Sequence, residues 1–416
     1  MDIRTLARIT LPLACVNALT QAARTIMSTV GPVLALDYGL DAGALGMLSA
    51  ALFASYCLAQ LPAGMALDRW GPRRVQAALC LVAAAGFALF ATAHGLTTFV
   101  LARLLIGVGV ATGLIGMLKG NSEWFARHDV ARATGFGMAV GTLGSFLATV
   151  PAQAALPEIG WRGVLWCCAL SSILVGIWNL LSVRDRPGPS DGRSLRTDLR
   201  EIGHIVRAPA FLRFAPVAAL LSVLNFTYLG LWAGPWLRDV AHLGSEARAQ
   251  VLLLYTFGLL VGGPLTGIAV SRVQRQHGHP LLVPVLCTAG LILVQAALAC
   301  EPESLVLVTM LWLAFAVFAA CGPAAYAAVA SQFPVAQAGR VSTAINTTTL
   351  ALVFGLQVVI GQLVEAWPAL SDGHWNPHGY TAGLLITIAL QILALAWCYL
   401  SGTRLQEERT GPQKAL

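Results

Sequence analysis

The sequence predicts an all-α membrane protein in which twelve transmembrane helices form two six-helix bundles. The first observation is composition: 57% of the 416 residues are hydrophobic and only 11% are charged, whereas about 25% of a soluble domain is charged. The second is a series of apolar runs of helical length. The third is one long polar stretch that divides these runs into two sets of six.

Each apolar run is long enough to cross a bilayer, which takes about 20 residues of helix. The runs lie near 9–36, 43–67, 75–94, 97–122, 133–156, 161–183, 212–236, 249–271, 280–300, 304–332, 341–364 and 380–401. The polar stretch covers 184–211. We therefore expect an N-terminal bundle over 1–183, a cytoplasmic linker over 184–211 and a C-terminal bundle over 212–416.

The distribution of positive charge predicts the orientation. If both termini are cytoplasmic, 20 of the 26 Lys and Arg residues lie in the cytoplasm. Arg162, Arg238 and Arg248 then fall outside, and Arg24, Arg103 and Lys119 lie within spans, which matches the positive-inside rule. The first apolar run follows the start of the chain without a signal-peptide cleavage site. We expect a multi-pass protein of the inner (plasma) membrane.

Several classes of function are disfavoured. The net charge of +7 is spread over short loops and forms no basic stripe, so no nucleic-acid partner is expected. All nine cysteines lie in apolar runs without ligand spacing, so we expect no metal and no cofactor. We find no nucleophile–base pair and no nucleotide-binding loop, and an enzyme is not predicted.

The two halves carry similar signatures at matching loops. The strings GMALDR (64–69) and GIAVSR (267–272) end the second and eighth spans. WFARHDVAR (124–132) and QFPVAQAGR (332–340) follow the fourth and tenth. Such an internal repeat of six helices is typical of secondary transporters.

The string GMALDRWGPRR (64–74) resembles the signature of the loop between spans 2 and 3 in the major facilitator superfamily. The resemblance implies that superfamily's twelve-helix fold and a transporter working by alternating access. It also implies that this loop is a conformational latch and does not bind substrate. A generic basic loop is the alternative. The latch residues would be Gly64, Asp68, Arg69, Gly71, Arg73 and Arg74.

RLLIGVGVATG (103–113) is similar to the superfamily's motif in span 4. Gly107 and Gly109 would allow close helix contact. Arg103 could assist proton movement or only pack, and the sequence leaves both open.

Arg24 lies near the middle of the first span, where an arginine costs about 2.5–3.5 kcal/mol on insertion scales. Asn17, Gln21, Arg24 and Ser28 share one helical face, which predicts a helix that lines a pathway. No acidic residue lies in the middle of any predicted span. An anionic substrate is therefore the expected counter-ion, and pairing with backbone carbonyls at a helix break is the alternative.

Arg24 precedes Pro32 by eight residues, which resembles the organic anion and organophosphate branch of the superfamily. In that branch the corresponding arginine binds the substrate's anionic group. Lys119 resembles a basic residue of the same branch, and it is either a second anion contact or a residue that reaches the lipid headgroups. The second arginine that phosphate exchangers of this branch carry in span 7 is absent.

Further candidates for substrate contact lie in spans 7, 10 and 11. The aromatic ones could stack on a ring or an apolar body, and the amides could instead join helices. They are Asn225, Tyr228, Trp232, Tyr326 and Asn346, together with Gln357, which also lies in span 11.

The sequence thus predicts a secondary transporter for a small organic anion of the carboxylate or phosphate ester class. It would work by symport or anion exchange, as a monomer among membrane lipids, with a coupling ion such as a proton. An exporter or importer of neutral or cationic amphiphiles is the alternative, followed by a transport-dead sensor. The eight histidines lie in or near loops, so the coupling ion stays undecided.

Overall fold

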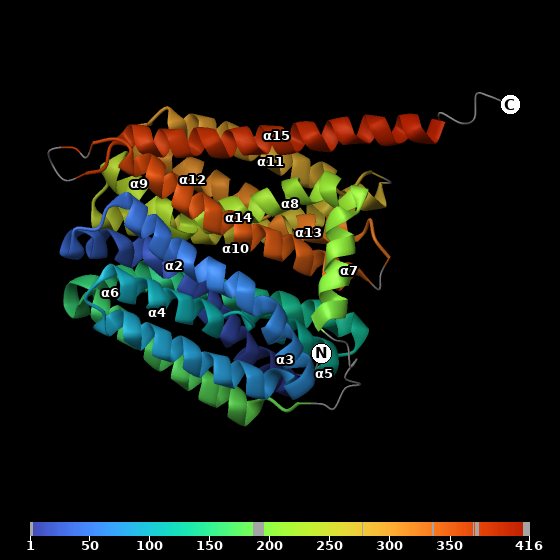
Figure 1. Cartoon of the computed structure of the whole chain (residues 1–416), viewed down its shortest axis with the longest axis horizontal. Helices are drawn as coiled ribbons and strands as arrows, with labels where there is room; N and C mark the ends of the chain where they lie inside the picture. Colours follow the sequence, from blue (N-terminus) through green and yellow to red (C-terminus); the bar gives the residue numbers. More distant parts are fainter. Residues whose placement is uncertain are drawn as a thin grey trace. The chain divides into compact units, whose positions relative to one another are not determined.

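The computed structural model describes residues 3–185, 195–276, 278–334, 337–368, 370 and 374–410. These residues are almost entirely helical (Figure 1). Residues 186–194 of the predicted linker lie outside the described part.

The first half of the chain forms long helices. A short α1 (Ile3–Thr5) and a π-helical segment η1 (Leu6–Thr10) lead into the first full span. In order, the helices are α2 (Leu11–Tyr38), α3 (Ala42–Thr92), α4 (Leu96–Gly109), α5 (Gly113–Trp124) and α6 (Arg127–Ser182). Asp41 caps the start of α3, where its carboxylate accepts a hydrogen bond from the backbone N–H of Ala44 at 2.7 Å.

The second half contains more helices, several of them shorter. They are α7 (Leu195–Arg207), α8 (Pro209–Thr227), the π-helical η2 (Tyr228–Trp232), α9 (Ala233–Asp239), α10 (Ser245–Arg275), α11 (Leu282–Ala299), α12 (Leu305–Ala319), α13 (Gly322–Ala330), α14 (Ala338–Glu365) and α15 (Pro377–Thr410). One hydrogen bond defines the wide turn of η2: the N–H of Ala233 donates to the carbonyl of Tyr228, five residues earlier. The chain therefore continues from α8 through η2 into α9 as one span with a local π-helical turn.

Two glycines divide the longest helices into pairs of spans. Gly71 in α3 has φ of 77° and Gly160 in α6 has φ of 66°, a left-handed conformation that a residue without Cβ adopts easily. Nine helical segments of the described residues are long and apolar enough to cross a membrane, some of them joining two of the helices above, and two of them, Ala42–Thr92 and Arg132–Ser182, have 51 residues. Broken at these glycines, the nine contain eleven segments of span length, and α2, with 28 residues, is the remaining helix that matches a predicted span.

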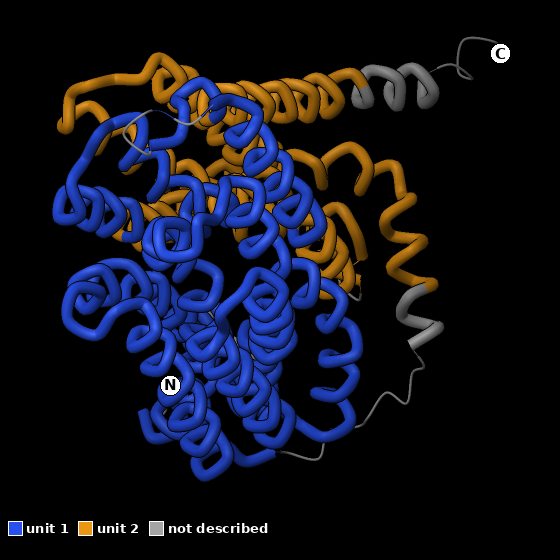
Figure 2. The backbone as a smooth tube through the Cα atoms, turned by 60° about the vertical axis from the view of Figure 1, so that its left-hand side comes forward, with its two compact units in different colours: residues 1–195, 226–256, 350–379 blue, residues 196–225, 257–349, 380–416 orange. Residues whose placement is uncertain are grey.

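By contacts, the chain divides into two compact units (Figure 2). Unit 1 contains residues 1–195, 226–256 and 350–379, and unit 2 contains 196–225, 257–349 and 380–416. Unit 1 thus includes η2, α9, the first part of α10 and the second part of α14 together with the first six spans. The predicted division into two sequence halves stays a prediction.

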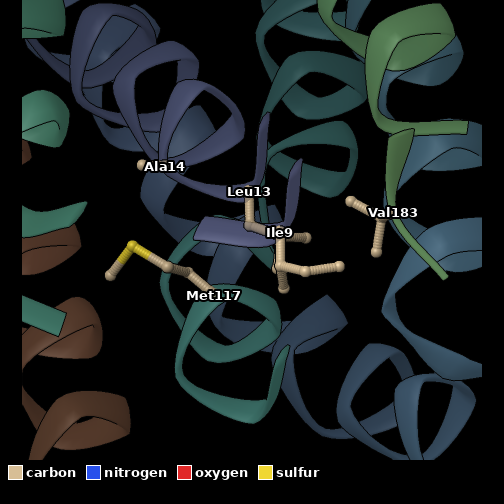
Figure 3. Close-up of a cluster of buried hydrophobic side chains, with 5 residues drawn as sticks. All are labelled: Ile9, Leu13, Ala14, Met117 and Val183. Carbon is tan, nitrogen blue, oxygen red and sulfur yellow. The ribbon is translucent and has the colours of Figure 1, made fainter. Parts of the chain in front are cut away.

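Unit 1 is built on close helix packing. Helix α2 packs chiefly on α6, and α3 on α4 and α6. At one end Ile9, Leu13, Ala14, Met117 and Val183 form a buried cluster (Figure 3). Its members come from η1, α2 and α5 and from the residue after α6, so the two ends of the six-span segment meet there.

Glycines bring the backbone of α2 close to that of η2 and α9. A Cβ added at Gly234 would lie 2.5 Å from the carbonyl oxygen of Ser28, and one at Gly230 would lie 3.2 Å from the carbonyl oxygen of Arg24. In α3 and α14, a Cβ at Gly46 would lie 2.5 Å from the carbonyl oxygen of Gln357. These close approaches place Arg24 at a junction of several helices.

Candidate functional site

The predicted latch loop lies at the break in α3. Lys119 of α5 donates to the Asp68 carboxylate at 2.6 Å and to the carbonyl of Leu67 at 3.0 Å. Lys119 is thus engaged with the latch residue Asp68. The structure does not bring it to Arg24 as a second anion contact.

The rest of the loop binds the end of α6. The backbone N–H of Arg73 donates to Asp185 at 3.0 Å, and its Nε donates to the carbonyl of Leu180 at 2.7 Å. A Cβ at Gly71 would collide with the Asp185 carboxyl group, so this position requires glycine for space as well as for its φ. Asp185 is a partner that the sequence analysis missed.

The remaining latch residues are less constrained. The Arg69 guanidinium lies 5.5 Å from the ring centre of Trp70. Arg74 is exposed, and a Cβ at Gly64 would meet nothing within 4 Å. Gly64 therefore makes no close contact with a neighbouring helix in this conformation.

Arg103 of α4 is fully buried and joins three helices. Its Nε donates to the carbonyl of Leu48 in α3 at 3.0 Å, and its Nη1 donates to the carbonyl of Ala23 in α2 at 2.9 Å. Gly107 and Gly109 on the same helix lie against the backbone of Leu52 and Ala83. These contacts favour the packing role for Arg103 over a role in proton movement.

Arg24 is also buried, with 8% of its surface exposed, but its surroundings differ. Its Nη1 donates to the side-chain oxygen of Gln21 at 3.2 Å. Its guanidinium carbon lies 4.6 Å from the ring centres of both Tyr56 and Phe226. Its Nε has no hydrogen-bond partner within the described residues. The cation is thus held by one amide and two aromatic faces.

The other members of the predicted polar stripe contribute unequally. Only Gln21 contacts Arg24 directly. A Cβ at Gly141 of α6 would lie 3.2 Å from the side-chain carbon of the Asn17 amide, so Asn17 packs against α6. The hydroxyl of Ser28 donates to the carbonyl of Thr25 at 2.8 Å in its own helix.

Two of the span 7 candidates lie in unit 1 and three other candidates lie in unit 2. Tyr228 and Trp232 form part of η2 and are buried. Asn225, Tyr326 and Asn346 belong to unit 2 and are half-buried. Within unit 2, the hydroxyls of Tyr326 and Thr349 share a hydrogen bond of 2.6 Å.

Sequence reasoning missed the aromatic partners of Arg24. Tyr56 lies in the second span and Phe226 follows Asn225 in the seventh. An aromatic residue in an apolar span is indistinguishable from core until its neighbours are known. The nearest available signal was that Phe226 adjoins a residue already selected.

A buried carboxylate also escaped notice because it lies close to a loop. Asp239 is fully buried at the end of α9. It accepts hydrogen bonds from Arg238 at 2.5 and 3.0 Å, and its Oδ1 lies 2.8 Å from Nδ1 of His374. A permanently charged arginine therefore neutralises Asp239.

No group of three or more His, Cys, Asp or Glu side chains within the described residues could hold a metal ion. The arrangement around Arg24 instead offers a desolvated positive charge with hydrogen-bond donors. Such a group recognises an anion.

The chain is similar to known membrane transporters. The family model described as Major Facilitator Superfamily matches residues 13–358. The probable galactarate/D-glucarate transporter GudP of Bacillus subtilis is 22% identical over 92% of this chain and 89% of its own length. The probable L-galactonate transporter of Escherichia coli is 30% identical over 38% of this chain, which spans only 35% of that relative's length.

A solved structure supports the fold. The bacterial homologue of the human lysosomal transporter Spinster, in an inward-facing and occupied conformation, is 18% identical with a TM-score of 0.77. The superposition covers 95% of this chain and 96% of that one. At this identity the likeness shows the fold alone, and it confirms the predicted fold class of twelve membrane-spanning helices.

Proposed function

Because this chain belongs to the major facilitator superfamily, we propose that it is a secondary transporter that moves a small organic anion across the inner membrane. The observation that supports this most directly is Arg24, a guanidinium in the middle of a span with no carboxylate partner within the described residues. The substrate's anionic group supplies the missing negative charge.

The energetics favour a mobile counter-ion. A buried cation without a counter-charge is strongly destabilising, because removal from water costs several kcal/mol in a real protein. The rings of Tyr56 and Phe226 offset part of that cost, at about 1 kcal/mol for each cation–π contact. The remainder is available as binding energy when an anion arrives.

The same positive charge opposes the alternative substrates. A cationic amphiphile would be repelled by Arg24 at close range. The two rings that could have stacked on such a guest lie over the guanidinium instead. A neutral amphiphile would leave the charge unmatched, so an anion is the better substrate.

The relatives agree with this class. One is named a probable transporter of galactarate and D-glucarate, and another a probable transporter of L-galactonate. All three are organic acids. From these relatives we propose only the substrate class of small organic anions for this protein, and we do not propose a single compound.

The transport cycle in this proposal is alternating access by the two six-helix bundles, as symport or anion exchange. The protein acts as a monomer with both termini in the cytoplasm. Arg24 contacts the substrate and Gln21 orients the guanidinium through Nη1. The loop around Asp68, Lys119, Arg73 and Asp185 holds one conformation of the cycle.

Reconstitution into liposomes tests the proposal. The purified protein should take up or exchange a radiolabelled carboxylate that thermal-shift screening has identified. R24Q should reduce the transport rate at least 100-fold, because it removes about two charge-assisted hydrogen bonds to the substrate. R275Q is the matched control, since Arg275 is an exposed arginine of α10. Normal transport by R24Q would refute the role of Arg24. Uptake of amphiphilic cations but not anions would refute the function.

A further inference from the structure

Two more buried polar groups near Arg24 have no hydrogen-bond partner within the described residues. They are the hydroxyl of Thr227, at the end of α8, and the side-chain oxygen of Gln357 in α14. Both residues are fully buried. With Nε of Arg24 they make three orphaned polar atoms in one part of unit 1.

The positions of these residues are linked through span 7. Thr227 follows Phe226, whose ring covers Arg24. The side-chain N–H of Gln357 donates to the carbonyl of Thr227 at 3.2 Å. A Cβ placed on Gly230, one turn later, would lie 3.2 Å from the carbonyl oxygen of Arg24 and 3.6 Å from Nε2 of Gln357.

The orientation of the Gln357 amide is chemically determined. The atom that faces the Thr227 carbonyl must be a donor, because a carbonyl oxygen only accepts. The amide oxygen of Gln357 therefore points elsewhere and remains an acceptor without a donor.

The hydroxyl of Thr227 departs from the usual behaviour of threonine in a helix. Such a hydroxyl commonly donates to the carbonyl four residues earlier. Thr25, Thr256 and Thr266 do so here, at 2.8, 3.0 and 2.8 Å. The hydroxyl of Thr227 makes no such bond at the junction with the π-helical η2.

Buried polar atoms are nearly always satisfied, and each exception requires an explanation. The three orphans differ in type: Arg24 offers a donor, Gln357 an acceptor and Thr227 either. A guest that satisfies all of them carries an anionic acceptor together with a group that donates and accepts. A hydroxyl next to a carboxylate has this combination.

We propose that Thr227 and Gln357 recognise a hydroxyl group of the substrate and that the substrate is accordingly a hydroxycarboxylate. This inference rests on the proposed function. The carboxylate accepts from Arg24, while the hydroxyl donates to the Gln357 oxygen and accepts from the Thr227 hydroxyl. The two groups become accessible as α2, η2 and α14 separate during the cycle.

A site of this kind discriminates strongly, because a guest without the hydroxyl leaves the protein groups unpaired in a buried place. Competition against uptake with matched pairs measures this. Malate should inhibit at least tenfold more strongly than succinate, and lactate at least tenfold more strongly than propionate.

Two near-isosteric variants assign the discrimination to these residues. T227V and Q357M remove the orphaned groups and keep the volume, so both should fold. Without substrate T227V should melt no lower than the native protein, while Q357M, which also loses the bond to the Thr227 carbonyl, should melt slightly lower. In both variants, the ratio of inhibition by malate to inhibition by succinate should fall to within about threefold of unity. T256V is the control, since Thr256 is a buried threonine whose hydroxyl is bonded within α10, and its ratio should stay native.

The outcomes are distinguishable. Equal inhibition by malate and succinate in the native protein would overturn the inference and leave anion transport intact. A native ratio in both T227V and Q357M would also overturn it and would assign the orphaned groups to bound water. Failure of every carboxylate to inhibit would overturn the proposed function itself.

Discussion

Arg24 and Arg103 are both buried arginines in membrane-spanning helices of unit 1, and they are held differently, although one guanidinium nitrogen of each, Nε of Arg24 and Nη2 of Arg103, has no hydrogen-bond partner within the described residues. Arg103 donates to two backbone carbonyls and joins α2, α3 and α4. Arg24 has one amide partner and two aromatic faces. One of the two carbonyls that accept from Arg103 belongs to Ala23, so Arg103 positions the backbone next to Arg24. The guanidinium of Arg103 therefore holds helices together, whereas that of Arg24 is available to a substrate.

The largest effect is expected from R103M. It removes two charge-assisted hydrogen bonds and leaves the carbonyls of Leu48 and Ala23 with one partner fewer. We expect the free energy of unfolding to fall by on the order of 3 kcal/mol, measured by denaturant unfolding in detergent. Native stability in R103M would erase the contrast with Arg24.

F226L should weaken substrate binding without unfolding the protein. Loss of one ring removes a cation–π contact of about 1 kcal/mol and lets the guanidinium leave its position. We expect affinity for the transported anion to fall about fivefold, measured by thermal shift against substrate concentration. F53L is the matched control, because Phe53 packs against Phe226 with ring centres 6.3 Å apart. An unchanged affinity in F226L would show that the ring does not position Arg24.

The stability of R24Q provides the other side of the comparison. The variant removes a buried charge whose Nε is unsatisfied, and it loses the hydrogen bond to Gln21 and the cation–π contacts with Tyr56 and Phe226. The two effects oppose each other, so the free energy of unfolding should change by no more than about 1 kcal/mol. A loss as large as that of R103M would mean that Arg24 also holds the helices together.

The smallest effect is expected from K119M, a third basic residue within a predicted span. Its partner Asp68 has 73% of its side chain exposed, and an exposed ion pair contributes only about 0.5 kcal/mol. Stability should barely change, and anion affinity at Arg24 should stay native. A loss of anion affinity comparable to that of R24Q would restore Lys119 as a substrate contact.

The sequence was sufficient for the features that depend on composition and spacing. The twelve spans follow from apolar length, and Arg24 was identified because an arginine far from any acid in the sequence is conspicuous in an apolar helix. The latch loop was recognisable because its spacing is specific.

The remaining features depend on contacts between distant segments. The pairing of Lys119 with Asp68 joins residues 51 positions apart. The contact of Arg24 with Phe226 spans the two halves of the chain. Thr227 was overlooked because a threonine in an apolar helix normally satisfies itself, and only the packed structure shows that this one does not.

The π-helical turn at Tyr228–Trp232 has a consequence for the phase of span 7. An α-helix advances about 100° per residue, and a π-helical turn accommodates one residue more than an α-helical turn. The wide turn therefore offsets the faces of α8 and α9 by roughly one residue's rotation. If the same residues formed a regular α-helical turn instead, Trp236, which is now buried, would rotate by about 100° away from its present neighbours, whereas deleting Leu229 as well would leave Trp236 close to its present orientation. The extra residue in η2 thus changes which sequence positions of α8 and of α9 lie on the same side of span 7.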